Sequence, residues 1–393
     1  MGLFDKCYEF TRAEEAQKMG IYPYFTPIEA VNGNKVKTKG KEMIMVGSNN
    51  YLGLLDDPGV MQAAKAAIDR YGVATCGSRF LNGTLDIHVE LDDRLAAFMQ
   101  KEAALTFSTG FQTNQGIIST LVGHGESVIT DKMDHASIID ACRLSRGEVH
   151  TFKHNDMSDL QKILSSLGKD KGKLIVVDGV FSMEGDLSNL PEIISLAQKY
   201  NSRVMVDDAH GIGVMGENGR GTVEHFGVED DVDLVMGTFS KSFASLGGFV
   251  AGEKKVISFI KHHARALIFS ASITPASVAA ALATLDIIEK QPERRKRLWD
   301  VTKKMKNGLE GMGYDTGPTE TPIIPVFIRD DKRAFMLWKM LRECGIFTNP
   351  IIYPAVPPGE ALIRTSYSAN HSDEELDAVL AAFESSGRTL GLI

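Results

Sequence analysis

The chain contains little cysteine: four residues in 393, which lie far apart at Cys7, Cys76, Cys142 and Cys344. This spacing matches neither a zinc motif nor a disulfide framework, so we expect no metal site and a reducing, cytoplasmic setting. Basic residues are fewer than acidic ones, 43 against 51, and the formal net charge of -8 argues against a general nucleic-acid role. No apolar run approaches the ~20 residues of a membrane span, and the start of the chain lacks the apolar stretch of a signal peptide. These absences favour a soluble globular protein.

Short runs of β-branched residues alternate with helical stretches between residues 46 and 289. This alternation predicts a large α/β domain with a mostly parallel sheet covered by helices. Residues 290–393 predict a smaller α+β C-terminal domain, because helical segments there flank apolar strands. Residues 1–45 are interpreted as an N-terminal arm, with an amphipathic helix over residues 3–19 and a turn at Asn32-Gly33-Asn34. The strands expected in the large domain include residues 127–130, 174–177, 204–206, 234–236 and 248–251.

One lysine stands among small hydroxyl residues in Gly237-Thr238-Phe239-Ser240-Lys241-Ser242, just after the apolar run 232–236. A lysine amine is a useful nucleophile toward an aldehyde when burial lowers its pKa. An aldehyde cofactor that carries a phosphate also needs hydroxyls and free amides beside it. A lysine in a Gly/Ser-rich loop is more often a solvated turn residue, so this stretch alone does not decide the function.

A second signal is Arg203-Val204-Met205-Val206-Asp207, an apolar strand that ends on a carboxylate and is followed by His210. A pyridine-based electron sink works best when its ring nitrogen stays protonated, which an adjacent carboxylate favours. A nearby imidazole can hydrogen-bond the phenolic oxygen of such a ring. Asp207, His210 and Lys241 therefore offer three complementary contacts to one cofactor, although either of the first two alone would read as an ordinary loop residue.

Two other patterns do not support a site. The residues from Gly211 to Gly216 match G-x-G-x-x-G after a strand, but Glu217-Asn218-Gly219-Arg220-Gly221 continues them as a loop where a dinucleotide fingerprint requires a helix. His262 and His263 are adjacent, unlike the i, i+4 pair that puts two imidazoles on one helical face. A nicotinamide oxidoreductase and a zinc enzyme are therefore disfavoured.

Four motifs in order along the chain resemble those of the α-oxoamine synthases. These are fold-type I pyridoxal-phosphate enzymes, which condense an amino acid with an acyl-CoA and release carbon dioxide. The resemblance covers nearly the whole chain and implies a large domain with a mostly parallel seven-stranded sheet plus the smaller C-terminal domain. One departure is Asp208, where the family commonly has Glu. The motifs are Gly237 to Ser242, Asp207 to Gly211, Asp134 to Ser137 and Asp178 to Gly185.

The resemblance implies pyridoxal 5′-phosphate (PLP) as cofactor and a role for each matching residue. Lys241 would bind the cofactor as a Schiff base and move the substrate α-proton, while Asp207 would pair with the pyridine nitrogen. His210 would hydrogen-bond the ring oxygen, and His135 would stack over the ring. Further contacts are implied for Gly110, Phe111, Ser182, Thr238 and Ser240 on the cofactor, for Phe269 and Ser270 on the phosphate site of the neighbouring subunit, and for Asn50 and Arg364 on the amino-acid substrate.

Two more segments, Gly20 to Phe25 and Gly77 to Thr84, are most similar to the bacterial branch of the family that joins L-serine to a long-chain acyl-CoA. With palmitoyl-CoA the product would be 3-ketodihydrosphingosine, the first intermediate of sphingolipid synthesis. The resemblance implies a homodimer with shared active sites, and contact with a membrane surface stays open. The alternatives are a glycine C-acetyltransferase or another α-oxoamine synthase. A non-catalytic scaffold would have no need of Lys241, Asp207 and His135.

Overall fold

The computed structural model describes residues 2–393 and divides into two compact units. The large unit comprises residues 49–299 and 320–322, and the small unit comprises the residues up to Ser48 with residues 300–319 and 323–393. The boundary between residues 299 and 300 falls inside helix α13 (Pro292–Gly311). The first 48 residues belong to the same unit as the C-terminal segments. The boundaries expected from the sequence at residues 45 and 289 stay predictions. Within residues 2–393, every helix is too short or too polar to cross a membrane.

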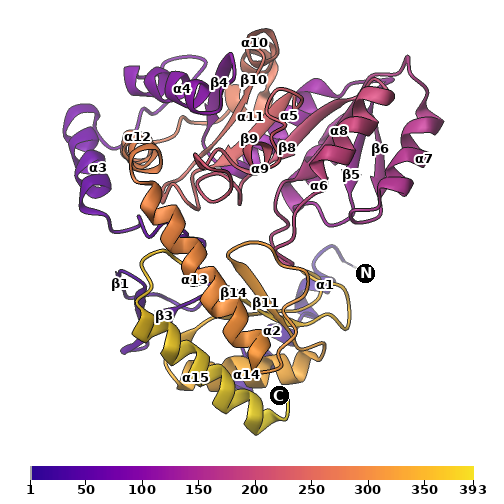
Figure 1. Ribbon diagram of the computed structural model, residues 1–393. Coiled ribbons are helices and arrows are strands. Elements are labelled where there is room, and N and C mark those ends of the chain that lie inside the picture. The colour runs from indigo at the N-terminus through magenta and orange to yellow at the C-terminus, as the bar shows by residue number, and fades with distance from the viewer. Residues whose placement is uncertain (1) are drawn as a thin grey trace. The chain divides into compact units, whose positions relative to one another are not determined.

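The large unit is built on a seven-stranded sheet in the order β4-β10-β9-β8-β7-β5-β6 (Figure 1). Only β10 runs antiparallel to its neighbours, so the expected mostly parallel sheet is confirmed. The carboxyl ends of the parallel strands meet at one edge, which is where open α/β sheets bind ligands. The strands are β4 (Ala103–Phe107), β5 (Ser127–Asp131), β6 (Glu148–Phe152), β7 (Lys173–Asp178), β8 (Arg203–Asp207), β9 (Leu234–Thr238) and β10 (Gly248–Gly252).

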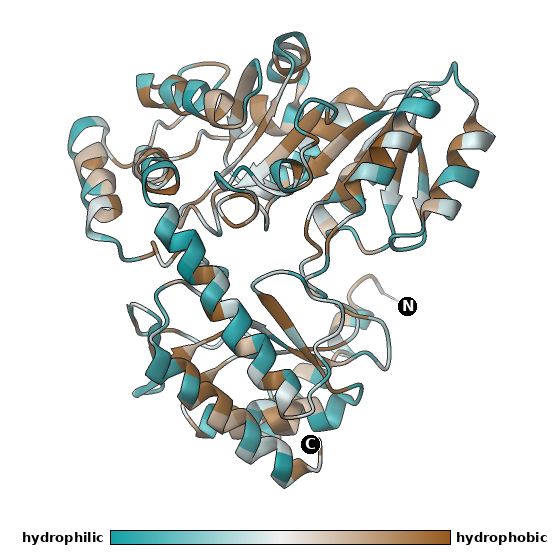
Figure 2. Cartoon of the chain, in the orientation of Figure 1, coloured by the Kyte–Doolittle hydropathy of each residue, from teal (hydrophilic) through white to brown (hydrophobic). Residues whose placement is uncertain are grey.

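Helices pack against this sheet and bury its apolar strands. One core joins side chains of β4, β5, β7, β8, β9 and β10 to α5, α6 and α10, and Figure 2 shows apolar residues along the strands with polar residues on the covering helices. Parallel strands covered in this way read as continuous apolar runs. The helices of this unit are α3 (Pro58–Tyr71), α4 (Asp86–Phe98), α5 (Gly110–Leu121), α6 (Ala136–Leu144), α7 (Met157–Leu167), α8 (Leu190–Lys199), α9 (Thr222–His225), α10 (Lys254–His263), α11 (Arg265–Ile268) and α12 (Pro275–Lys290).

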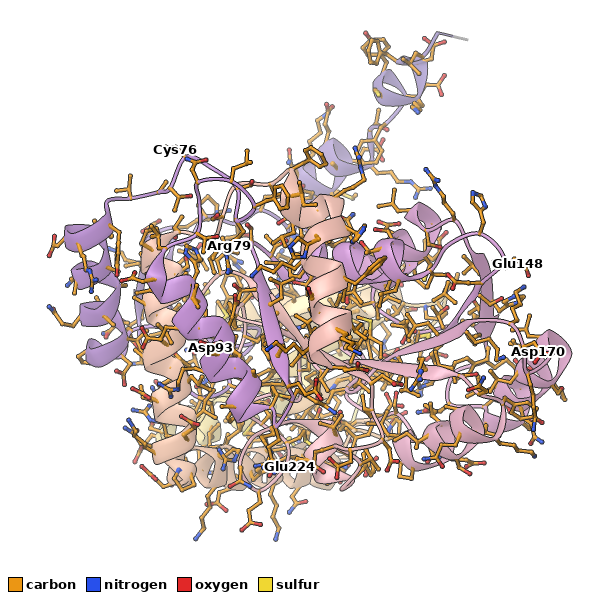
Figure 3. The ribbon with its side chains drawn as sticks, turned by 90° about the horizontal axis from the view of Figure 1, so that it is seen from above. Cys76, Arg79, Asp93, Glu148, Asp170 and Glu224 are labelled. Carbon is orange, nitrogen blue, oxygen red and sulfur yellow. The ribbon has the colours of Figure 1, made fainter. Side chains whose placement is uncertain are left out.

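The loop from Gly77 to Thr84 is held in place by one buried arginine. The Arg79 guanidinium lies 2.7 Å from the Asp92 carboxylate on α4 and donates to the Thr106 hydroxyl on β4 at 2.6 Å. Figure 3 shows Cys76, the residue before this loop, at the edge of the view and Arg79 further inside. The charged groups of Arg79 and Asp92 are both largely excluded from water. Loss of either side chain would therefore leave the other charge buried and unpaired, which would lower the stability of the fold. In this chain Arg79 therefore has a structural role.

The small unit contains two sheets and its own core. One sheet has the order β1-β2-β3-β12 and the other the order β11-β14-β13; buried side chains of α13, α14 and α15 pack with residues of β11, β12 and β14. Its strands are β1 (Ala30–Asn32), β2 (Lys35–Thr38), β3 (Lys41–Met45), β11 (Ile323–Phe327), β12 (Ile346–Phe347), β13 (Asn349–Ile351) and β14 (Leu362–Ser366), and its helices are α1 (Asp5–Tyr8), α2 (Arg12–Lys18), α14 (Asp331–Glu343) and α15 (Asp373–Leu390), with α13 (Pro292–Gly311) divided between the units.

The helix expected over residues 3–19 is wrong in its extent, because the structure has two short helices, α1 and α2. Thr11 interrupts them: it is the N-cap of α2, and its hydroxyl donates to Glu15 at 2.7 Å. Neither helix buries a residue, so tertiary packing does not stabilise a longer one. The expected hairpin turn is confirmed, with β1 and β2 paired on either side of Gly33.

Candidate active site

A cavity of about 260 Å³ lies at the carboxyl edge of the large sheet. Asp178, Asp207 and Thr238 are the last residues of β7, β8 and β9, and all three line it. The geometry therefore follows from parallel strands that end side by side. Nine residues expected from the sequence are brought together here: Gly110, Phe111, His135, Ser182, Asp207, His210, Thr238, Ser240 and Lys241.

The Asp207 carboxylate is buried and both of its oxygens are engaged. Asn114 of α5 donates to Oδ2 at 2.6 Å, and the Ala209 amide donates to Oδ1 at 3.1 Å. The same Asn114 nitrogen also lies 2.8 Å from the Ser137 hydroxyl oxygen. These donors fix the orientation of the carboxylate at the cavity.

His135 precedes α6 as its N-cap residue, and its tautomer follows from its contacts. Its Nδ1 accepts from the Ser137 amide at 3.2 Å and lies 2.8 Å from the Ser137 hydroxyl. Desolvation lowers the pKa of His135; the Asp207 charge opposes this change and the Lys241 charge adds to it. The neutral ring, with its proton on Nε2, is therefore favoured near pH 7, and Nε2–H is the donor available to a ligand.

His210 is oriented by a tyrosine that the sequence analysis did not single out. The Tyr51 hydroxyl lies 2.7 Å from His210 Nδ1, and both side chains are buried. A buried hydrogen bond of this kind sets which ring nitrogen carries the proton. Tyr51 is thus part of the site's geometry.

Lys241 lies on a tight loop directly after β9. The loop is closed by backbone hydrogen bonds from Phe239 to Gly247 at 2.9 Å and from Ser245 to Phe239 at 2.8 Å. The rings of Phe239 and Phe243 are fully buried, with centroids 5.2 Å apart. These anchors hold the loop so that Ser240 and Lys241 line the cavity, together with Leu246 and Gly247 at its far end.

One corner of the cavity suits an anion. The Thr238 and Ser240 hydroxyl oxygens are 3.0 Å apart, and α5 begins beside them at Gly110. A β-carbon on Gly110 would lie 2.8 Å from the Thr238 hydroxyl oxygen, so only glycine allows this approach. The first-turn amides of a helix have no intrahelical partners and point outward, which makes a helix N-terminus a ready site for phosphate.

Two further carboxylates lie close to Asp207. Asp178 lines the cavity and accepts from the His135 amide at 2.9 Å, while Asp134 accepts from the Asp178 amide at 2.9 Å. Burial raises the pKa of both groups well above the usual range, and the charges of neighbouring carboxylates add to the effect. Burial thus disfavours the charged form of Asp134 and of Asp178.

Asp208, next to the cavity, occupies a closely fitted space. A β-carbon on Gly211 or on Gly221 would lie 2.0 Å from its carboxylate oxygens. The Thr222 amide donates to Asp208 Oδ2 at 2.6 Å. The Asp208 carboxylate therefore requires glycine at positions 211 and 221, because any larger residue there would collide with it.

Four residues expected from the sequence do not line this cavity. Phe269 is 73% exposed and packs under the Arg265 guanidinium, while the Ser270 hydroxyl accepts from Gln112 of the same chain at 3.1 Å. Asn50 accepts from the Leu54 amide at 3.0 Å. Arg364 belongs to the small unit, where its side chain is largely buried on β14. The roles proposed for these residues rest on the sequence alone.

The sequence analysis missed Tyr51, Asn114, Ser137 and Asp178 as members of the site. Ser137 and Asp178 stand inside motifs that were recognised, and Tyr51 follows Asn50, so their positions carried a signal. Asn114 carried none, because its distance from Asp207 depends on how α5 packs. Within residues 2–393, no group of three or more His, Cys, Asp or Glu side chains is arranged to hold a metal ion.

Comparisons with known proteins agree with this geometry. The model of the family "aminotransferase class I and II" matches residues 41–383. The chain is 51% identical to the serine palmitoyltransferase of Sphingobacterium spiritivorum, over 95% of this chain and 94% of the relative. The chain belongs to the α-oxoamine synthases. It is also 44% identical to the 8-amino-7-oxononanoate synthase of Thermoanaerobacter pseudethanolicus, over 97% of each chain.

A solved structure supports the fold and the cofactor of this α-oxoamine synthase. A lysine-to-alanine variant of serine palmitoyltransferase from S. paucimobilis, with a bound PLP–myriocin aldimine, is 37% identical and superposes with a TM-score of 0.96 over all of both chains. The fold is that of fold-type I PLP enzymes. The family is PLP-dependent, and this α-oxoamine synthase is a PLP-dependent acyltransferase.

The cavity residues fit PLP. Asp207 offers a carboxylate for a protonated ring nitrogen, Lys241 an amine for the aldehyde, and the corner at Thr238, Ser240 and the start of α5 an anion site. Asn114 Oδ1 is buried and has no hydrogen-bond partner among the described residues.

Proposed function

We propose that this enzyme condenses L-serine with a long-chain acyl-CoA, palmitoyl-CoA in the reference case, and releases CoA and carbon dioxide. The product would be 3-ketodihydrosphingosine, which would make this the first step of sphingolipid synthesis. The observation that carries the proposal is the cavity that combines Lys241, Asp207 and His135 in a chain 51% identical to a serine palmitoyltransferase over nearly its full length.

Bound PLP would supply an electron sink for the substrate α-carbon. Asp207, held by Asn114 and the Ala209 amide, is positioned to stabilise positive charge on the ring nitrogen. Lys241 would hold the cofactor and transfer the α-proton, since an amine freed from the cofactor is a base at the reacting carbon. His210, oriented by Tyr51, would hydrogen-bond the ring oxygen beside Ser182.

His135 would act on the substrate carboxylate as well as on the ring face. Its neutral ring presents Nε2–H while Nδ1 is engaged by Ser137. A donor held at a fixed angle can keep the carboxylate oriented for loss of carbon dioxide. Asn50 and Arg364 are proposed as further substrate contacts, and the planar guanidinium of arginine suits a carboxylate.

We further propose a homodimer in which Phe269 and Ser270 of one subunit reach the phosphate site of the other. The exposure of Phe269 supports this proposal, because a large apolar side chain at the surface is a common feature of an interface. A cytoplasmic location is supported by the four cysteines, all of which are free thiols. Peripheral contact with a membrane would bring the enzyme to long acyl chains.

The alternative within the family is a glycine C-acetyltransferase or another α-oxoamine synthase, and the 44% identity to an 8-amino-7-oxononanoate synthase keeps it in view. Each buried methylene contributes about 0.8 kcal/mol, so four extra buried methylenes would favour a long thioester roughly a hundredfold. We therefore expect serine with palmitoyl-CoA to have a kcat/KM at least roughly tenfold above that of glycine with acetyl-CoA.

The test is a CoA-release assay with serine, glycine and alanine, each with palmitoyl-CoA and acetyl-CoA below the micelle concentration. Mass spectrometry of the ketone product identifies which amino acid was condensed. Faster turnover of glycine with acetyl-CoA would overturn the proposal and favour the glycine C-acetyltransferase alternative.

A further inference from the structure

His154 lies between two carboxylates that come from different segments of the large unit. It follows β6, and its Nδ1 is 3.0 Å from Asp131 at the end of β5, while its Nε2 is 2.9 Å from Asp186 in the loop after β7. The Asp131 side chain is 1% exposed and that of Asp186 is 11% exposed. The imidazole thus bridges two segments that are far apart in the sequence.

The next residue reinforces the same bridge. The Asn155 amide donates to Asp131 Oδ2 at 2.8 Å, and its side chain donates to the Leu187 carbonyl at 3.0 Å. Asn155 has φ of +49°, a left-handed conformation that asparagine tolerates better than most residues. We call His154 and Asn155 together the bridge pair.

Each segment joined by the bridge pair carries a residue of the cavity. On one side Asp131 accepts from the Met133 amide at 2.8 Å and donates its own amide to Asp134 at 2.8 Å, which closes the turn that leads into His135. On the other side the Phe181 amide donates to the Asp186 carbonyl at 3.0 Å, and Ser182 follows Phe181 into the cavity.

The charge and packing of His154 favour two hydrogen bonds and a fixed ring orientation. Burial disfavours the imidazolium, but hydrogen bonds to Asp131 and Asp186 outweigh it and raise the pKa of His154 to about 10. Both ring nitrogens therefore donate at neutral pH. The Phe181 ring meets the imidazole edge-on, with centroids 4.4 Å apart, and restricts its rotation.

We propose that His154 is a positioning residue for the active site, whose two hydrogen bonds hold the turn that carries His135 against the loop that carries Ser182. It does not touch the cavity and acts through these two residues. The proposal rests on the proposed function only for the contacts of His135 and Ser182 with the cofactor. Loss of the bridge would let the two sides of the cavity move relative to each other.

The primary variants are His154→Gln, which removes the charge but keeps one donor, and Asp186→Asn, which weakens the Ser182 side and leaves the Asp131 contact in place. Apo-protein of each variant is titrated with PLP, and affinity and the visible circular dichroism of the bound cofactor are recorded. We expect affinity to fall on the order of tenfold or more and the dichroic band to change, because small displacements at a cofactor have large effects.

Two controls separate positioning from general destabilisation. Glu148→Gln removes an exposed charge at the opposite end of β6, where Figure 3 shows Glu148 at the edge of the molecule. Leu164→Ala opens a cavity in the buried face of α7 and lowers the melting temperature without touching the bridge pair. Both controls should keep the wild-type affinity for PLP and the wild-type dichroic band.

The outcomes are distinct. Unchanged PLP affinity and dichroism in Asp186→Asn and His154→Gln, together with a lower melting temperature, would overturn the proposal and leave His154 as a purely structural residue. If His154→Gln does not fold, Asp186→Asn decides the question by the same readouts. Because both variants disturb the contact between His154 and Asp186, their effects should not be additive, and the double variant should lose less PLP affinity than the two single losses combined. Wild-type protein that binds PLP but does not condense serine would refute the proposed function and leave this inference standing.

Discussion

The hydroxyl of Tyr51 and Nδ1 of His210 lie 2.7 Å apart inside the large unit, although 159 positions separate the two residues in the sequence. His210 lines the cofactor cavity, while Tyr51 stands behind it. The contact ties the start of the large unit to the segment after β8. It makes the orientation of one active-site imidazole depend on a residue outside the cavity.

Tyr51→Phe should therefore fold and bind PLP but work less well. Loss of the hydrogen bond between Tyr51 and His210 costs about 1 kcal/mol of stability. A His210 ring that lacks this contact should lower kcat/KM about tenfold, for which ~1.4 kcal/mol is enough. Steady-state kinetics and the absorption spectrum of the bound cofactor across pH measure the effect. Tyr314→Phe is the matched control, because it also removes one buried hydrogen bond, to the Phe383 carbonyl at 2.8 Å, in the small unit. A wild-type spectrum and rate in Tyr51→Phe would argue against a role in orienting His210.

Lys241→Ala should keep its fold, because the change removes a side chain that faces the cavity and no core volume. It should lose the visible absorption that arises when PLP is attached to a lysine, together with condensation activity. Absorbance and CoA release after reconstitution with PLP provide the measurement, and Lys261→Ala, an exposed lysine on α10, serves as control. Retained turnover in Lys241→Ala would refute the assignment of this lysine.

Asp208→Asn should flatten the pH dependence of stability. Burial raises the pKa of Asp208 from 3.8 to about 7, so between these values the folded protein binds a proton that the unfolded chain has released. The free energy of unfolding of the wild type therefore falls as pH rises from about 4 to about 7 and stays lower above that range. Since each unit of pKa difference corresponds to about 1.4 kcal/mol, the penalty is on the order of a few kcal/mol.

The free energy of unfolding, measured with urea at pH 5 and at pH 8, gives the contribution of Asp208 ionisation to stability. Asn keeps the acceptor for the Thr222 amide and removes the ionisation, so Asp208→Asn should lose less stability than the wild type between the two pH values. Asp230 is exposed, so Asp230→Asn should show the same change in the free energy of unfolding between pH 5 and pH 8 as the wild type. An equal pH dependence in Asp208→Asn and wild type would show that Asp208 titrates normally in the folded protein.

Hybrid dimers test whether the active site is shared. Protomers with Lys241→Ala and protomers with Ser270→Trp should each be inactive, because one lacks the amine and the other fills the proposed phosphate contact. After exchange of subunits, one composite site in each hybrid is intact, and random mixing should restore up to roughly a quarter of the wild-type rate. Exchange is verified with differently tagged subunits. No recovery in verified hybrids would place Ser270 in the site of its own subunit.

Much of the fold was accessible from local patterns. The strands around 174–177, 204–206 and 234–236 are continuous apolar runs, which a sheet covered on both faces requires, and the loop after Gly211 was correctly separated from a helix because its glycines and polar residues cannot start one. The edge strands β4 and β6 were missed. β6, for example, reads Glu-Val-His-Thr-Phe and is largely exposed, so its pattern differs little from that of a loop.

The short motifs also pointed to the residues around the cavity, because a lysine after one strand and a carboxylate at the end of another meet wherever parallel strands end together. Their partners were beyond the reach of the sequence. Asn114 and Tyr51 meet Asp207 and His210 only because the folded chain brings them to the segment at the end of β8. His154 likewise reaches two carboxylates 23 and 32 positions away. A linear pattern records which groups can do chemistry. Their orientation and protonation depend on desolvation and on neighbours that the folded chain brings within hydrogen-bonding distance.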